Sequence, residues 1–224
     1  AALAMQQNDD ALKHLVAALD LYRNLKDLSK VGEALQGIGI VYEQIGEPKL
    51  SLDYLQQALN VFQDIGDTRG IARVHVSLGI HYWKQNDLPK AILFYEQAMA
   101  YQKQLDDPIG YAATLSNIAT IHQIQGEYSK AIELYQQVIN LKDAHESTRG
   151  LAIAYGNMGE AYLKQKKLKE ADDALSQSLV LAEGINALDV IVATLDNLVA
   201  LRKEQGRLAE ALELKDKQGD YNAR

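Results

Sequence analysis

The stretch Lys90-Ala-Ile-Leu-Phe-Tyr-Glu-Gln-Ala98 decides the fold, because variants of it return along the chain at a constant distance. Its first alanine belongs to a row of small residues at one constant interval: Ser51, Ala91, Ala131, Ala171 and Ala211. Two further rows keep the same period of forty, namely Gly39, Gly79, Ala119, Gly159 and Val199, and Leu55, Tyr95, Tyr135, Leu175 and Lys215. Three rows in one phase indicate a repeat protein, whose repeats bury their apolar faces against their neighbours.

The residue pattern within each repeat unit predicts two helices. Apolar residues recur at helical spacing in the first helix, as at Ile38, Val41 and Ile45. The small rows allow the two helices to approach closely, so a large side chain at Gly79 is expected to wedge them apart.

Tight turns are predicted between the two helices of each unit. Gly46, Gly126 and Gly206 stand where a helix ends in a left-handed residue, a conformation that glycine adopts without a Cβ clash. Asn86 is the next-best residue for this place. Lys166 is the exception, and we expect either strain or a different cap there.

These rows resemble the tetratricopeptide repeat (TPR). The resemblance rests on Leu78-Gly-Ile-His-Tyr82 in a first helix and on Ala91-Ile-Leu-Phe-Tyr-Glu-Gln-Ala98 in a second helix. It extends from about residue 8 to residue 217 and implies an all-α, right-handed superhelix of antiparallel helix pairs. The usual TPR unit has about 34 residues, so the longer unit of this chain implies longer helices. This longer form is similar to Partner-of-Inscuteable-type spindle adaptors and to regulator modules of bacterial signalling proteins.

We expect a single solenoid domain over residues 1–224. Its predicted parts are an N-terminal half repeat (1–27), four repeats (28–67, 68–107, 108–147 and 148–187) and a C-terminal capping repeat (188–224). The capping repeat departs from the pattern at Val199, Arg202 and Lys215, as expected for a face that meets water. The chain begins inside a repeat, which predicts a fragment of a longer protein.

Composition excludes several classes of function. With 23 basic and 30 acidic residues the net charge is −7, which opposes a nucleic-acid interface and an anionic membrane surface. No cysteine is present, so disulfides and thiolate metal sites are excluded. No apolar run approaches the roughly 20 residues that cross a bilayer. We expect no cofactor, no metal, no nucleic acid and no membrane partner. We expect the protein to lie in the cytoplasm, and the periplasm is the alternative.

Catalytic motifs are also missing, so we expect no enzyme. The chain has no phosphate-binding loop, no Gly-x-Ser-x-Gly and no His-Glu-x-x-His motif. His75 and His81 are separated by a spacing that does not place two ligands on one helix face. His122 stands at a tyrosine position of the repeat and is expected to pack.

The resemblance implies that first helices line a concave binding surface. One row of these helices holds Gly37, Ser77, Asn117, Asn157 and Asn197. In the resembled family, asparagine at this position hydrogen bonds the backbone of a bound peptide, because an amide both donates and accepts. The alternative is that each asparagine bonds a neighbouring helix and stabilises the stacking.

Helical spacing adds further candidates for this groove. They are Arg73, Ile80, Trp83, Lys84, Gln123, Leu163 and Lys164. Trp83, the single tryptophan, is a candidate aromatic anchor, and packing between repeats is its alternative. Arg69 and Arg149 are expected to pair with local carboxylates such as Asp67 and Glu146, and the alternative is that they pair with acidic groups of a ligand. Only Arg73 is cationic in its row, which argues against a clamp for a C-terminal pair of aspartates.

The sequence therefore predicts a non-catalytic scaffold that binds a peptide or helical segment of a partner protein in its groove. The alternative is a ligand-sensing regulatory domain of a larger bacterial signalling or transcription-regulator protein. A third hypothesis is self-association through an open N-terminal helix face around Leu12, Leu15 and Leu19.

Overall fold

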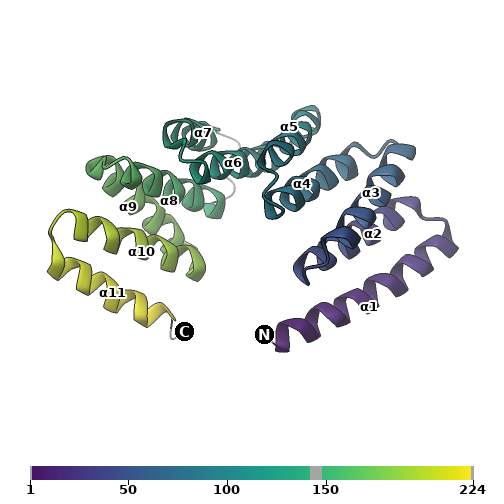
Figure 1. Ribbon diagram of the computed structural model, residues 1–224, viewed down its shortest axis with the longest axis horizontal. Coiled ribbons are helices and arrows are strands. Elements are labelled where there is room, and N and C mark those ends of the chain that lie inside the picture. Colours follow the sequence, from purple (N-terminus) through teal and green to yellow (C-terminus); the bar gives the residue numbers. More distant parts are fainter. Residues whose placement is uncertain (1, 142–147, 223–224) are drawn as a thin grey trace. The chain divides into compact units, whose positions relative to one another are not determined.

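The computed structural model describes residues 2–141 and 148–222, and these residues form helices joined by short turns, without a β-strand (Figure 1). The helices are α1 (Ala2–Leu25), α2 (Leu28–Gln44), α3 (Pro48–Asp64), α4 (Thr68–Lys84), α5 (Leu88–Gln104), α6 (Pro108–Ile124), α7 (Tyr128–Asn140), α8 (Thr148–Lys164), α9 (Leu168–Gly184), α10 (Leu188–Glu204) and α11 (Leu208–Asn222). The even-numbered helices α2 to α10, called first helices below, begin at the constant interval of the sequence repeat. The others are called second helices. The predicted all-α fold of helix pairs is confirmed.

The chain forms two compact units, residues 1–107 and residues 108–224. In unit 1, each helix from α1 to α5 packs on the next, and α2 also contacts α4. In unit 2, each helix from α6 to α11 does the same, and α8 also contacts both α6 and α10. First helices therefore lie beside one another within each unit, and the second helices pack against them.

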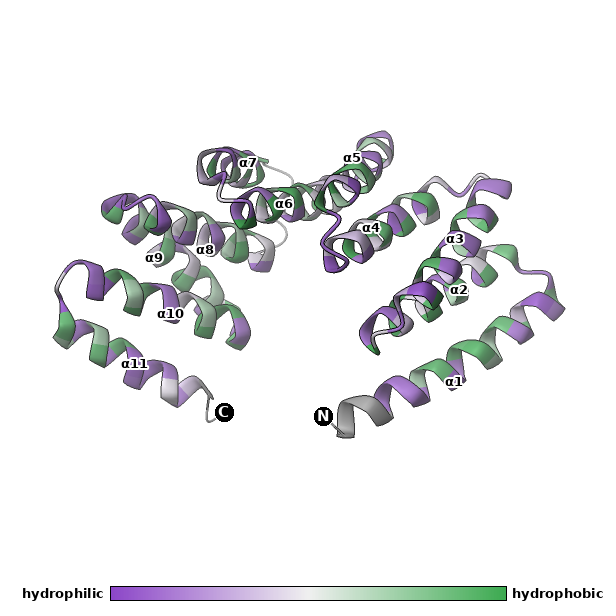
Figure 2. Ribbon diagram, viewed as in Figure 1, coloured by the Kyte–Doolittle hydropathy of each residue, from purple (hydrophilic) through white to green (hydrophobic). Residues whose placement is uncertain are grey.

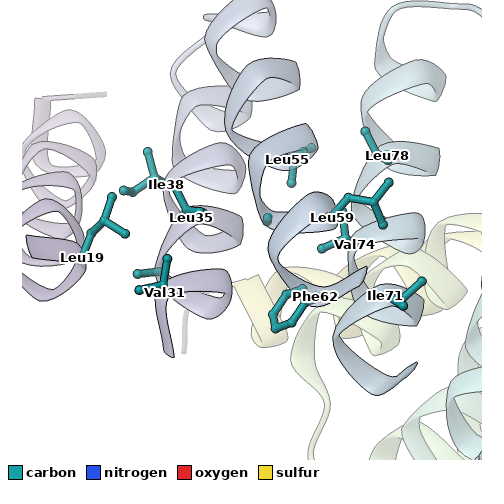
Figure 3. Close-up of a cluster of buried hydrophobic side chains, with 12 residues drawn as sticks. Leu19, Val31, Leu35, Ile38, Leu55, Leu59, Phe62, Ile71, Val74 and Leu78 are labelled. Atoms are coloured by element: carbon teal, nitrogen blue, oxygen red, sulfur yellow. The ribbon is translucent and has the colours of Figure 1, made fainter. Parts of the chain in front are cut away.

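Both units have an apolar interior. In unit 1, Ile38, Leu55 and Phe62 from α2 and α3 are at most 1% exposed and pack with side chains of α1 and α4 (Figure 3). In unit 2, Leu175 and Leu195 belong to an equivalent cluster. Figure 2 shows that hydrophobic and hydrophilic segments alternate along each helix, as expected for helices with one buried face.

Inside the helix pairs, residues of the small row through Gly79 contact the large side chains of the row through Tyr95. A Cβ atom on Gly79 would lie 2.4 Å from Cε1 of Tyr95, and one on Gly159 would lie 2.6 Å from Cγ of Leu175. Since carbon atoms in contact are about 3.5–4.0 Å apart, neither position has room for a methyl group. Glycine there allows the paired helices to approach.

The turns recur at regular intervals, after first and second helices alike. Residues with positive φ stand at Lys26, Gly46, Gly66, Asn86, Asp106, Gly126, Lys166, Asn186 and Gly206. At Lys166, φ is 60°, its N–H donates to the carbonyl of Leu163, and the N–H of Lys167 donates to that of Tyr162. The glycine turn at Gly126 has the same two bonds, so the cap at Lys166 is the ordinary one and the strain remains.

An ion-pair cluster connects the last three helices. Arg202 of α10 donates two hydrogen bonds, of 2.8 and 2.9 Å, to the carboxylate of Asp172 in α9, and it lies 3.3 Å from Glu210 in α11. The side chain of Arg202 is 14% exposed, so these contacts are partly shielded from water. The departure of residue 202 from the repeat pattern therefore provides a specific link between helices.

Replacing Gly79 by alanine should destabilise the protein by about 1–3 kcal/mol, because the new methyl group overlaps the buried Tyr95 ring. The matched control is Gly219→Ala in α11, where no atom lies within 4 Å of the added Cβ. That change should be neutral or stabilise by about 0.5 kcal/mol. Urea unfolding followed by circular dichroism measures both. Equal effects would contradict the close approach.

Replacing Lys166 by glycine should stabilise the protein by about 1 kcal/mol, because glycine adopts positive φ without a Cβ clash. The exposed ion pair of Lys166 with Glu204 contributes little against this gain. Lys169→Gly, inside α9, should instead cost about 1 kcal/mol. Thermal unfolding of the two variants separates the turn effect from general glycine effects. A loss of stability in Lys166→Gly would refute the strain.

Replacing Arg202 by methionine should cost about 2 kcal/mol at neutral pH, because it leaves a partly buried carboxylate unpaired. In the folded protein, hydrogen bonding from Arg202 lowers the pKa of Asp172. The pair therefore stabilises the fold above the unfolded pKa of about 4, and this contribution is lost as pH falls through the lowered folded value. The difference in the free energy of unfolding between the Arg202→Met variant and the wild type should therefore become smaller in acid.

Arg207→Met is the control for this change, since Arg207 forms an exposed pair with Glu210. Urea unfolding at several pH values should show almost no effect of this control. A gap between Arg202→Met and wild type that stays constant down to pH 2 would contradict the role of the Asp172 pair.

Candidate functional site

Each unit has an exposed stripe along its first helices. In unit 1 this first-helix face consists of exposed or half-buried residues of α2 and α4: Glu33, Gln36, Ile40, Glu43, Gln44, Arg69, Arg73, Ser77, Ile80, Trp83 and Lys84. In unit 2 the corresponding residues of α6, α8 and α10 include Asn117, Gln123, Ile124, Ile153, Asn157, Lys164 and Asn197. The stripe recurs in every repeat, because the opposite side of each first helix is buried.

The carboxylates on the first-helix face of unit 1 are paired. Glu33 lies 2.7 Å from Nζ of Lys30 and 3.6 Å from Nη2 of Arg73. Glu43 is 10% exposed and lies 2.6 Å from Nδ1 of the buried His81. Within the described residues, Lys84 forms no ion pair. This face therefore presents unpaired positive charge although the chain as a whole is acidic.

The local pairing expected for two arginines is wrong where the structure describes it. Asp67 caps α4 by accepting a hydrogen bond from the N–H of Gly70, and Arg69 has no ion pair among the described residues. Arg149 pairs with Asp189, one repeat further on, at 3.0 Å. Glu146 lies outside the described residues. The prediction failed because the carboxylate of Asp67 is used as the helix cap, and because the side chain of Arg149 reaches across to the neighbouring first helix.

A cavity of about 200 Å³ lies between α2, α3 and α4. It is lined by Ile40, Glu43, Gln44, Ser51, Leu55, Ser77, Ile80 and Lys84. Two predicted groove residues, Ile80 and Lys84, are therefore brought together in one pocket. Sequence reasoning missed Ser51, which it treated only as a member of the small row. The available signal was that Ser51 is the single polar member of that row.

The asparagine row has mixed surroundings. The hydroxyl groups of Thr120 and Tyr135 share a hydrogen bond of 3.0 Å, Asn157 lies beside the Tyr135 hydroxyl, and burial raises the pKa of Tyr135 to about 12. In the described part of the chain, the side-chain amides of Asn117 and Asn197 have no hydrogen-bond partner. In the next repeat, Leu175 takes the place of Tyr135, and it has no hydroxyl group that could bond Asn197. Asn157 thus has a polar structural neighbour that Asn197 lacks.

The other predicted groove residues differ in exposure. Trp83 is 39% exposed, and Lys164 is exposed. Gln123 is half-buried, and its Oε1 is covered and without a partner among the described residues. Leu163 is half-buried and packs against the core cluster of unit 2. Leu163 therefore contributes to folding whatever else it contacts.

The N-terminal leucines do not form the open face that was expected of them. Leu19 is 5% exposed and points toward the side chains of α2 (Figure 3), and Leu12 and Leu15 pack against the same cluster. Among the side chains of α1 that the structure describes, the large apolar ones that are exposed are Val16, Leu21 and Leu25. The correction arises because α2 covers the face of α1 that carries the three leucines.

The buried histidines take part in packing. His122 is buried, with Nδ1 2.8 Å from Glu127, and His75 Nδ1 lies 2.8 Å from the carbonyl oxygen of Ile71. Burial lowers the pKa of His75. Among the described residues, no three potential metal ligands cluster together, and none of the helices is long and apolar enough to cross a membrane.

Solved structures with a similar fold come from several proteins. BtubC (BKLC) from P. vanneervenii is 19% identical, with a TM-score of 0.81 over 96% of this chain and 91% of its own. The quorum sensor NprR from B. thuringiensis, in its apo form, is 20% identical, with a TM-score of 0.75 over 98% of this chain and 62% of its own. A Rap protein complexed with Competence and Sporulation Factor is 16% identical, with a TM-score of 0.69 over 99% and 72%.

These identities show a shared fold and no more. No curated protein matches the sequence. The family described as the MalT-like TPR region matches residues 53–220, and the family described as tetratricopeptide repeat matches residues 1–64. The resemblance drawn from the residue rows is therefore confirmed, and the chain belongs to the tetratricopeptide-repeat proteins, within the group described as the MalT-like TPR region.

Proposed function

We propose that the chain is a non-catalytic binding module whose first-helix faces hold an extended or helical segment of a partner protein. The observation that carries this proposal is the set of apolar side chains left uncovered on these faces. They are Ile40, Ile80 and Trp83 in unit 1, at 36–40% exposure, and Ile124 and Ile153 in unit 2, at 57% and 36%. Apolar residues gathered on one surface and bordered by polar ones are typical of interaction sites.

Polar groups on the same faces support the binding of a backbone. The amides of Asn117 and Asn197 are half-buried and have no hydrogen-bond partner within the described residues. An amide side chain can donate to a peptide carbonyl and accept from a peptide N–H. Half-burial limits the number of waters that compete, so such bonds would fix the path of a bound segment.

Structural partners support a role without catalysis. His81 and His122 are both held by carboxylates, and His75 is held by a backbone carbonyl. A general base needs access to a substrate proton, whereas these rings are buried in helix packing. We therefore propose binding rather than chemical conversion as the activity of this domain.

The alternative proposal is a ligand-sensing domain of a larger regulator. It is favoured by the similarity of the fold to the quorum sensor NprR and to the Rap protein complexed with Competence and Sporulation Factor. The two proposals differ in what stabilises the fold. A small effector that raises the unfolding temperature by itself would favour sensing, while enrichment of long segments would favour a scaffold.

The double variant Asn117→Ala/Asn197→Ala should weaken binding of peptides that the wild type enriches from a displayed library, by about five- to a hundredfold in Kd. Each lost hydrogen bond is worth roughly 0.5–1.5 kcal/mol, which sets this scale. The control is Asn60→Ala, an exposed asparagine on the second helix α3, which should leave Kd unchanged. Fluorescence anisotropy with the enriched peptides measures all three proteins.

Asn157→Ala is kept separate, because the position of Asn157 beside the Tyr135 hydroxyl predicts a loss of stability that the double variant should not show. Melting temperatures are therefore measured first. If the wild type enriches no peptide, or if a folded double variant binds the same peptides equally well, the asparagine row is structural and this proposal is wrong.

A further inference from the structure

We propose that the cavity between α2, α3 and α4 is an anchor pocket for one tyrosine side chain in an acidic segment of the partner. This inference deepens the proposed function and rests on it for the identity of the occupant as a peptide. The pocket itself can be tested without any peptide.

The size of the cavity fits a single side chain. Pockets for complete small molecules measure about 300–1,000 Å³, whereas this one measures about 200 Å³. An engineered apolar cavity of about 150 Å³ in another protein accommodates benzene. A slightly larger space therefore accepts a substituted benzene ring, which is the size of a tyrosine or phenylalanine side chain.

The walls of the pocket are apolar. Ile40 and Ile80 stand one repeat apart on neighbouring first helices and are 40% and 36% exposed. Leu55 lies beneath them and is 1% exposed. A ring inserted between the two isoleucines would cover apolar surface on both and would displace water from it. Aromatic side chains supply much of the binding energy of interfaces in such positions.

Ser51 makes this pocket different from a purely apolar one. The residue is 0% exposed and lines the cavity, and its hydroxyl has no hydrogen-bond partner in the described part of the chain. The equivalent residue is alanine in the other four repeats, so the helix pair does not require a hydroxyl there. A buried unpaired hydroxyl is costly, and a ligand with a polar tip removes that cost. A tyrosine hydroxyl can do so, whereas phenylalanine cannot.

The charges at the rim favour acidic neighbours of this tyrosine. Lys84 lines the pocket, is exposed and forms no ion pair with any described residue. The carboxylate at the rim, Glu43, is already held by His81 at 2.6 Å. A carboxylate placed next to the tyrosine would therefore meet a free cation and an occupied anion, which is the complementary arrangement.

The first experiment uses side-chain analogues as probes. We would titrate p-cresol, the analogue of tyrosine, and toluene, the analogue of phenylalanine, into the full chain with labelled isoleucine methyl groups. The methyl NMR signals of Ile40 and Ile80 should shift with both probes, and those of Ile153 in unit 2 should not. From the net value of one hydrogen bond, p-cresol should bind about three- to tenfold more tightly than toluene.

Two variants identify the groups responsible. Ser51→Ala restores the residue found in the other repeats, so it should fold normally while the preference for p-cresol over toluene disappears. Ile80→Lys should abolish binding of both probes. Its matched control is Ile65→Lys, a change at an isoleucine after α3 with a similar 37% exposure that lies outside the pocket lining and the first-helix faces, which should leave probe binding intact.

Peptides then test the occupant. Among peptides enriched by the wild type, replacing tyrosine by phenylalanine should weaken binding by the same factor as Ser51→Ala does. Lys84→Gln should weaken binding only of peptides with a carboxylate beside the tyrosine.

The outcomes are distinct. Absence of probe shifts at Ile40 and Ile80, or equal shifts at Ile153, would overturn the pocket. Equal affinity for the two probes, unchanged by Ser51→Ala, would overturn the role of the hydroxyl. Probe binding without any peptide enrichment would leave the pocket standing and overturn its peptide occupant together with the proposed function.

Discussion

The close approach of two helices within each repeat is the constraint on which the rest of this structure depends. It requires a residue without a side chain opposite a large one, as at Gly79 against the buried ring of Tyr95. Because the pairs approach closely on one side, first helices also lie against one another, and their opposite side remains uncovered. The surface available for binding is thus a consequence of how the repeats pack.

The proposed function then depends on where single repeats depart from the common pattern. Ser51 replaces an alanine and leaves a buried hydroxyl beside a cavity. Arg202 replaces a tyrosine and connects three helices through carboxylates. Both positions tolerate these changes because the shared rows already determine the backbone. One departure therefore contributes to stability, while we propose that the other provides a chemical group for a ligand.

Much of the fold could be predicted from the sequence, and less of the site. Periodicity sets which side of a helix is buried, so the rows through Gly39 and Leu55 predicted the helix pairs. The glycine turns could be predicted because glycine readily adopts a positive φ. The contacts of Ser51, Glu43 and Arg149 could not be predicted in this way. They depend on distances between neighbouring repeats, which spacing along one helix does not encode. Leu19 shows the same limit of sequence patterns, since the helix that buries it is the neighbouring α2.

Photo-crosslinking from matched positions tests most directly whether the first helices are the binding surface. The chain has no cysteine, so a single benzophenone can be attached through Ile40→Cys on α2 or Leu50→Cys on α3. These residues are 40% and 41% exposed, on a first and a second helix of the same unit. The account predicts crosslinks to an enriched peptide from residue 40 and almost none from residue 50. Equal crosslinking, or crosslinking from residue 50 alone, would contradict it.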